Sequence, residues 1–224
     1  MSLSAARGSL RRGTLAGAIG GTVFGLFLAT VVTPLIAHAE TFEAGHEHGS
    51  GHALSGLVTT LVSTLGGMLF GLLLGVVVFG AGYYLLEPVL PSPARIQSYL
   101  LGCFGFVIVS GAPWLVVPPQ PPGMTASLST GARIGWYVVM MGIGALACAI
   151  GAMVARQIDR SRLQRYALGA LAGVSILGAG VVLAPTVSVS GPIPQSVAHG
   201  FRWVSIGGQL GLWFVLASVH AWLG

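Results

Sequence analysis

The chain has 224 residues, of which 54% are hydrophobic and only 7% are charged. Soluble domains carry about 25% charged residues, so this sequence has too little polar surface for a water-soluble globule and is predicted to be an integral membrane protein. Its net charge of +5 comes from ten arginines and no lysine. These arginines lie near the ends of apolar runs, so the charge indicates orientation in a bilayer and argues against nucleic-acid binding.

Six apolar runs are long enough to cross a bilayer, for which a helix needs about 20 mainly apolar residues. They lie at residues 14–36, 57–86, 97–117, 134–155, 166–185 and 202–223. The second run is longer than a membrane requires, so it is expected to tilt or to begin outside the bilayer. The predicted fold is therefore all-α: a single integral membrane domain over 1–224, built as a polytopic bundle of about six transmembrane helices.

Arginines recur in every second connection between these runs. They are Arg7, Arg11, Arg12, Arg95, Arg156, Arg160, Arg162 and Arg165. Because positively charged connections stay in the cytoplasm, both termini are predicted to be cytoplasmic and the connection at 37–54 external. Arg133 and Arg202 are exceptions near the predicted outer ends of their runs, where a long side chain reaches the interface. The predicted location is the inner (cytoplasmic) membrane.

The first run has an alternative interpretation as a secretory signal, because Arg11 and Arg12 precede it and Ala37-His38-Ala39 resembles a cleavage site. However, signal peptides have apolar regions of only about 7–15 residues, and the run at 14–36 is longer. A ladder of glycines with four-residue spacing also favours close approach to a neighbouring helix; its members are Gly13, Gly17, Gly21 and Gly25. A retained first helix is therefore favoured, and the connection after it is external in either case.

Two further ladders occur later in the chain, one at Gly67, Gly71 and Gly75 and one at Gly207 and Gly211. Glycines at these spacings lie on one face of a helix, so tight helix contacts are predicted there. With 35 glycines in the chain, small residues are expected at many helix contacts of the bundle.

The connection between the first two runs holds the densest group of metal-ligand side chains. It reads AHAETFEAGHEHGSGH at residues 37–52, and its candidate metal ligands are His38, Glu43, His46, Glu47, His48 and His52. Gly45, Gly49 and Gly51 disfavour a helix, so a flexible loop is predicted that can wrap its ligands around an ion. Imidazole with carboxylate suits Co, Ni, Cu or Zn better than Mg or Ca. The alternative is a solvated loop whose histidines are incidental.

A proline-rich segment, SGAPWLVVPPQPPG, occupies residues 110–123. Pro113 removes a backbone donor and is expected to kink or end the third span, releasing carbonyls that can line a cavity and coordinate a cation. The alternative is a rigid external cap with Trp114 as an interfacial anchor, and the two interpretations are compatible. Ser110, Pro113 and Trp114 are therefore candidates for an ion pathway.

Further candidates lie at the ends of predicted spans. Glu87 ends the second run on the predicted cytoplasmic side, where it is either an inner relay for a cation or a partner of Arg95. His199 and His220 lie near opposite ends of the sixth run. A histidine in such a place is a ligand or, more often, an interfacial residue.

Enzymatic functions find no support in the sequence. An intramembrane serine protease would need glycine two residues before Ser110, where the chain has Ile108. The sequence contains no phosphate loop, dinucleotide fingerprint or paired catalytic carboxylates, and its spans essentially lack histidines for haem ligation. The chain is therefore predicted not to be an enzyme and to hold no tightly bound cofactor.

The combination of features resembles a known family. The glycine-laddered first helix, the His-rich loop, the Leu86-Glu87-Pro88 end of the second span and the string SGAPWLVVPPQPPG together resemble the CbtA family of predicted cobalt transporter subunits, best from about Gly13 to Gly151. The resemblance implies five or six helices, a cobalt substrate inferred from association with cobalamin regulation, and a small single-span, histidine-bearing partner, CbtB. A homo-oligomer is also compatible with it.

We therefore predict a membrane subunit of a transition-metal uptake transporter, with cobalt as the first candidate. The external loop captures Co(II) or another divalent ion, and its affinity is expected to fall below about pH 6 as the imidazoles protonate. Since the sequence has no ATP-binding motif, the energy must come from a partner, a proton or the membrane potential. The alternative is a non-transporting metal chaperone or assembly factor that displays the same loop to a partner.

Overall fold

The structure of the chain is a computed structural model that describes residues 3–42, 52–90 and 93–224, with side chains from residue 56 onward in the second of these segments. It comprises two compact units. Unit 1 contains Met1–Cys103, Gln120–Met124 and Pro192–Gly224, and unit 2 contains Phe104–Pro119 and Thr125–Gly191. The single domain predicted over 1–224 stays a prediction.

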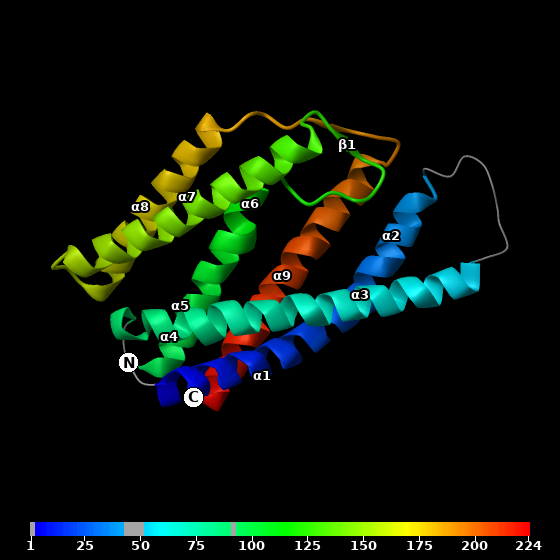
Figure 1. Cartoon of the computed structure of the whole chain (residues 1–224). Helices are drawn as coiled ribbons and strands as arrows, with labels where there is room; N and C mark the ends of the chain where they lie inside the picture. The colour runs from blue at the N-terminus through cyan, green and yellow to red at the C-terminus, as the bar shows by residue number, and fades with distance from the viewer. Residues whose placement is uncertain (1–2, 43–51, 91–92) are drawn as a thin grey trace. The chain divides into compact units, whose positions relative to one another are not determined.

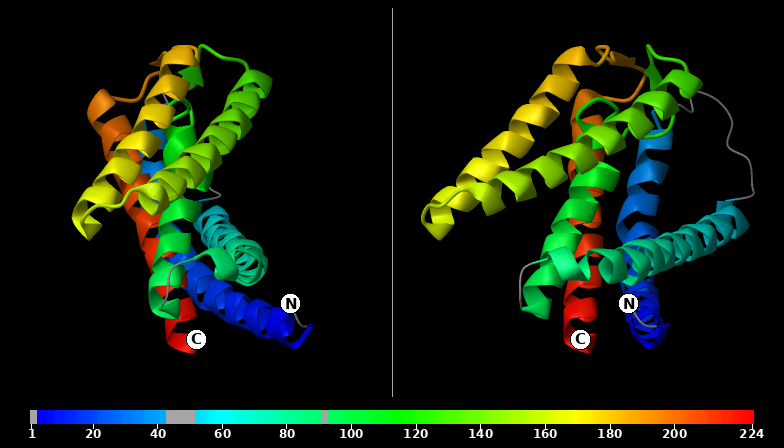
Figure 2. Two further views of the ribbon diagram at one scale, coloured as in Figure 1. Left: turned by 90° about the vertical axis from the view of Figure 1, so that its left-hand side faces the viewer. Right: turned by 60° about the vertical axis from the view of Figure 1, so that its left-hand side comes forward.

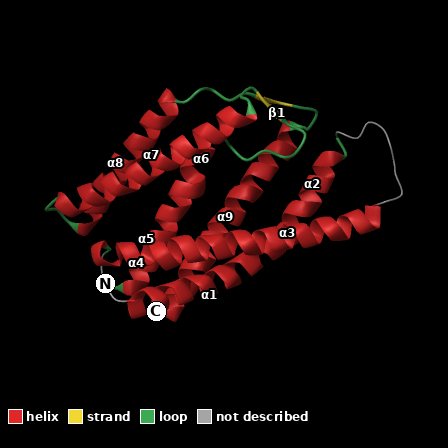
Figure 3. Ribbon diagram, in the orientation of Figure 1, coloured by secondary structure: helices red, strands yellow, loops and turns green. Residues whose placement is uncertain are grey.

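The described chain is almost entirely helical (Figures 1 and 3). The first long helical segment consists of α1 (Leu3–Phe27), η1 (Leu28–Val32) and α2 (Thr33–Glu40). The second consists of α3 (His52–Leu74), η2 (Gly75–Gly82), α4 (Tyr83–Leu86) and η3 (Glu87–Val89). The third consists of α5 (Ala94–Phe106), η4 (Val107–Gly111) and α6 (Ala112–Trp114). The other three are α7 (Thr130–Gln157), α8 (Arg162–Leu183) and α9 (Gln195–Leu223). A short antiparallel pair joins β1 (Thr125–Ala126) to β2 (Val189–Ser190).

Six helical segments of the described chain are long and apolar enough to span a membrane. They are Leu3–Glu40, Gly56–Val89, Ala94–Trp114, Thr130–Gln157, Arg162–Leu183 and Gln195–Leu223. The all-α fold with six spans is thus confirmed, and the chain is a multi-pass membrane protein. The side on which each terminus lies stays a prediction.

The bounds predicted for the external loop, 37–54, were wrong at both ends. Helix α2 continues to Glu40, and α3 already begins at His52. The reason is local: Ala37-His38-Ala39-Glu40 contains no helix breaker, and the glycines that disfavour a helix begin only at Gly45. His38 therefore lies on a helix and not in a loop.

Serines set the starts of two helices, and two prolines lie inside spans. Pro34 and Pro113 each directly follow a π-helical segment, η1 and η4, within a continuous helical span. Ser129 begins α7 by accepting a hydrogen bond from the backbone N–H of Ala132 at 3.3 Å. Ser161 begins α8 in the same way, which satisfies backbone donors that the first turn would otherwise leave unpaired.

The glycine ladders of the first two spans pack against each other in unit 1. α1 and α3 run in opposite directions side by side (Figure 1). A Cβ added at Gly17 would lie 2.8 Å from the carbonyl oxygen of Gly71. One added at Gly67 would lie 2.5 Å from Cα of Gly25. The two backbones therefore approach too closely for any side chain between them, which confirms the tight contact predicted for both ladders.

Helix α9 packs against another face of α1 (Figure 2). The ring of Phe27 lies against Gly208, and the side chain of Leu216 lies over Gly20. Gly207 and Gly211 have open space beside them, so the tight contact predicted for this third ladder was wrong. Their spacing does place them on one helix face, but that face of α9 is not covered by a neighbouring helix in the described chain.

In unit 2, α7 and α8 form an antiparallel hairpin. A Cβ added at Gly151 would lie 2.8 Å from the carbonyl oxygen of Gly169, so this pair also packs backbone to backbone. Near the turn, Nε of Arg165 donates a hydrogen bond to the Ala155 carbonyl at 2.8 Å. The apolar core of the unit lies between α6 and α7 and comprises Ala112, Val116, Val117 and Met140.

Candidate functional site

The predicted metal ligands lie mainly outside the described part of the chain. Glu43, His46, Glu47 and His48 fall in the segment 43–51, and His52 opens α3 with its side chain also outside the described residues. Among the residues that are described, no group of three or more His, Cys, Asp or Glu side chains comes together to hold a metal ion. The loop site therefore stays a prediction.

His38 is the predicted loop ligand whose side chain is described. It lies exposed in the last turn of α2, and its ring packs edge-on against Phe42 with 5.3 Å between ring centroids. Its carbonyl accepts a hydrogen bond from the hydroxyl of Thr41 at 2.7 Å. This imidazole is thus held at the end of the helix that leads into residues 43–51.

The released carbonyl at the proline segment is already occupied. Pro113 cannot donate to the carbonyl of Val109, and the hydroxyl of Tyr137 donates to it instead, at 2.7 Å. Pro113 and Ser110 are buried, and Trp114 is half-buried. Tyr137 escaped the sequence analysis because it lies 28 residues from its acceptor and in another helix.

Glu87 and His199 are both exposed. Glu87 begins η3, and in the described part of the chain no ion pair joins it to Arg95. His199 lies near the start of α9. The structure brings neither of them into a cluster with another described candidate, and their predicted places in an ion pathway stay predictions.

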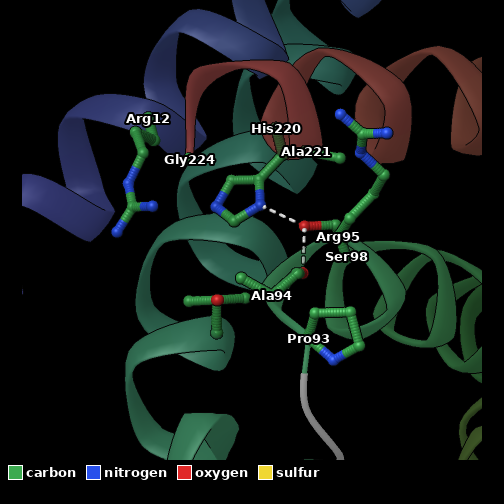
Figure 4. Close-up of a pocket in the computed structure, with 9 residues that line it drawn as sticks. Arg12, Pro93, Ala94, Arg95, Ser98, His220, Ala221 and Gly224 are labelled. Carbon is green, nitrogen blue, oxygen red and sulfur yellow. Dashed lines mark hydrogen bonds between the residues drawn. The ribbon is translucent and has the colours of Figure 1, made fainter.

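A cavity that the sequence analysis missed lies at one end of unit 1. It has a volume of about 240 Å³ and is formed by α1, α4, α5 and α9. We call it the His220 cavity; the polar side chains that line it are Arg12, Tyr83, Arg95, Ser98 and His220 (Figure 4). It lies at the end of the α1–α3 pair opposite to His38, because Arg12 is near the start of α1 and His38 near the end of α2.

His220 is the buried centre of this cavity, with only 1% of its surface exposed. Its ring packs against Tyr83 with 4.6 Å between centroids and against Phe79 with 5.4 Å. Nδ1 shares a hydrogen bond with the hydroxyl of Ser98 at 2.9 Å. Nε2 has no hydrogen-bond partner in the described chain, although the backbone of Phe79 lies nearby. Figure 4 shows this second nitrogen on the side of the ring that faces Arg12.

The hydroxyl of Ser98 determines what Nε2 can do. It has one proton, which it can donate to the carbonyl of Ala94 at 3.3 Å or to Nδ1 of His220 at 2.9 Å. When the proton goes to Nδ1, the neutral imidazole carries its own proton on Nε2 and presents a donor. When it goes to Ala94, Nε2 presents a lone pair instead.

A second buried hydrogen-bonded chain holds the wall of the cavity. The hydroxyl of Tyr83, which is 2% exposed, donates to Oε1 of Gln97 at 2.6 Å. Nε2 of Gln97 donates to the carbonyl of Leu90 at 3.5 Å. These bonds connect α4 to α5 and fix the tyrosine ring on which His220 packs.

The charges of the cavity are positive. The guanidinium carbon of Arg12 lies 5.8 Å from the centroid of the Tyr83 ring, and Arg95 lies exposed on the other side of His220 (Figure 4). No carboxylate side chain lines the cavity; Glu87 acts electrostatically on Tyr83 but is not part of the lining. In the described chain, neither arginine forms an ion pair. Such a lining can donate hydrogen bonds to an anion and repels a cation.

Comparison with known proteins gives one match. The protein-family model described as "Probable cobalt transporter subunit (CbtA)" matches residues 7–224, nearly the whole chain. No curated protein and no solved structure matches the chain. The match includes parts of all six spans and of both units, and it contains the undescribed segment 43–51.

Proposed function

The chain belongs to the CbtA family of probable cobalt transporter subunits, and from this premise we propose that it captures a divalent transition metal, cobalt first, for uptake across the cytoplasmic membrane. The segment between α2 and α3 is the proposed capture site, with His46, Glu47, His48 and His52 as its main ligands. His38 and Glu43 complete the set. In this function the chain acts as a transporter subunit and not as an enzyme, and the metal is its substrate.

The geometry of the first two spans supports an external capture site. α1 and α3 pack antiparallel, so the connection between α2 and α3 lies at the end of this pair opposite to Arg12. Arginine-rich ends stay in the cytoplasm, which leaves the His-rich connection outside. His38, exposed at the end of α2, lies at the entrance to that connection.

The chemistry of the ligands supports a borderline divalent ion. Neutral imidazole and carboxylate together bind Co, Ni, Cu or Zn, whereas Mg and Ca prefer oxygen ligands alone. Capture must also be reversible, because a site that binds too tightly does not conduct. A short glycine-rich connection that collects several weak ligands meets this requirement better than a rigid site.

The family description, a subunit, implies a partner. We propose a small single-span, histidine-bearing protein similar to CbtB, which supplies ligands inside the bilayer. Glu87, Ser110, Pro113, Trp114 and His199 remain the candidates on this chain for the rest of the pathway. The membrane potential is a sufficient driving force in principle, since a divalent cation gains about 4.6 kcal/mol per 100 mV of inside-negative potential.

Cobalt accumulation by cells that express the chain with its small partner tests this proposal. Replacing His46, His48 and His52 together with alanine should lower uptake at submicromolar cobalt by about tenfold or more, because most imidazole ligands are lost. Gln164→Ala is the control, since it removes an exposed polar side chain that lies outside the connection and is no candidate for the pathway. Unchanged uptake by the triple variant would refute metal capture by this segment. A different outcome would favour a metal chaperone: the parent chain binds cobalt but cells that express it accumulate none, and the triple variant does not bind cobalt.

A further inference from the structure

The His220 cavity is not accounted for by metal capture at the other end of the α1–α3 pair. It combines two guanidinium groups and a buried imidazole, and no carboxylate side chain lines it. We propose that this cavity binds the phosphate group of an anionic lipid headgroup.

His220 presents one ring nitrogen that no side chain of the described chain engages. A buried polar atom without a good partner is costly, and apart from the backbone of Phe79 nothing in the described chain lies beside Nε2. With Ser98 donating to Nδ1, Nε2 carries a proton and faces the side of Arg12 (Figure 4). A phosphate oxygen held by Arg12 can accept from it.

The charged side chains that line the cavity are both cationic. Arg12 is half-buried and lies beside Tyr83, and Arg95 lines the same cavity from α5. A guanidinium group presents a planar fork of donors that matches phosphate oxygens. A metal ion would find one imidazole and no carboxylate side chain there, and Arg12, which acts electrostatically on His220, would repel it. The cavity therefore selects an anion.

The cavity lies where several spans end. Its walls are the ends of four membrane-spanning segments, at the end where the arginine pattern predicts the cytoplasmic surface. Basic pockets between transmembrane helices on that side bind anionic lipid headgroups. Its volume of about 240 Å³ accommodates a phosphate group. A lipid carries its phosphate group at the membrane surface, so the proposed ligand is a lipid and not free phosphate.

Lipid binding to the purified full-length chain, measured by native mass spectrometry in a neutral detergent, tests this inference. The probes are a short-chain phosphatidylglycerol, a phosphatidylcholine of equal chain length, and inorganic phosphate. The variants are Arg12→Gln and Arg95→Gln, neither of which empties the apolar core. The matched control is Arg11→Gln, because Arg11 is an adjacent exposed arginine that does not line the cavity.

Phosphatidylglycerol should bind more tightly than phosphatidylcholine. Arg12→Gln should weaken its binding about tenfold or more, the loss expected for a charge-assisted hydrogen bond to phosphate, while Arg11→Gln should change it less than about twofold. Arg95→Gln should weaken binding in the same direction. Competition by millimolar inorganic phosphate, with the same dependence on Arg12, would support a phosphate site but overturn its assignment to lipid.

Equal effects of Arg11→Gln and Arg12→Gln, or equal binding of the two lipids, would overturn the inference, because the affinity would then come from surface charge or from acyl chains. Since the assay contains no metal, either outcome leaves the proposed capture of cobalt standing. A failure of the cobalt-uptake test would likewise leave the lipid site standing, because cobalt uptake does not report on what occupies this cavity.

Discussion

Gly66 and Gly67 provide a matched test of the contact between α1 and α3. They are adjacent residues in α3, and changing either to alanine adds one methyl group to the same helix. A Cβ at Gly66 has nothing within 4 Å, whereas a Cβ at Gly67 would lie 2.5 Å from Cα of Gly25. Ordinary contact begins at 3.4 Å, so Gly67→Ala must separate the two backbones by 3.4 − 2.5 = 0.9 Å.

The two substitutions should differ by about 1–3 kcal/mol in the free energy of unfolding. Any gain in helix propensity, up to about 1 kcal/mol, is common to both and cancels in the comparison. What remains is the cost of overpacking a closely packed contact, which is typically about 1–3 kcal/mol. The backbone of Gly25 cannot rotate away as a flexible side chain would, so the helices themselves must move.

Thermal unfolding of the detergent-solubilised variants measures this difference. For a chain of about this size, 1 kcal/mol shifts the melting temperature by about 2–4 °C, so Gly67→Ala should melt about 2–12 °C below Gly66→Ala. If the melting temperature of Gly67→Ala equalled or exceeded that of Gly66→Ala, the backbone contact between the two helices would be contradicted.

Three further results are expected. Tyr137→Phe should lower the free energy of unfolding by about 1–3 kcal/mol, because it leaves the Val109 carbonyl without a donor. The control is Tyr166→Phe, at a position that is 60% exposed. Equal unfolding temperatures for the two variants would contradict the hydrogen bond. Ser129→Ala should cost about 1 kcal/mol through loss of the N-cap of α7, measured by the same thermal assay, and an unchanged melting temperature would argue against the cap. Cobalt binding to the intact chain should weaken as pH falls below about 6, since a protonated imidazole cannot ligate a metal; equal affinity at pH 7.5 and 5.5, measured by calorimetry, would exclude histidine ligands.

The spans and glycine ladders were predictable because they depend on local sequence. Apolar runs of sufficient length define the six helices, and a four-residue spacing places Gly17 and Gly21 on one face of α1. Spacing does not reveal which face a neighbour covers. Gly207 and Gly211 have the same spacing as Gly17 and Gly21, yet they have open space beside them, because the position of the next helix is set by the whole bundle.

The His220 cavity was not predictable for a related reason. His220 and Ser98 are 122 residues apart in the chain, and His220 alone resembles an interfacial histidine at the end of a span. Only the packing of α5 and α9 turns it into a buried group with one bonded and one unpartnered nitrogen. The error at His38 was of the opposite kind. The glycines that favour a loop lie seven or more residues after it, so their effect does not extend back to His38.

Thiol labelling of intact cells tests the external capture site most directly. A single cysteine placed at position 50 by Ser50→Cys, in a chain whose Cys103 and Cys148 are replaced by alanine, should react with a membrane-impermeant maleimide from outside. Cobalt at micromolar concentration should slow that reaction several-fold, because ligands on both sides of the cysteine close around the ion. Labelling that occurs only after the cells are permeabilised would place the His-rich connection in the cytoplasm and contradict metal capture from the outside.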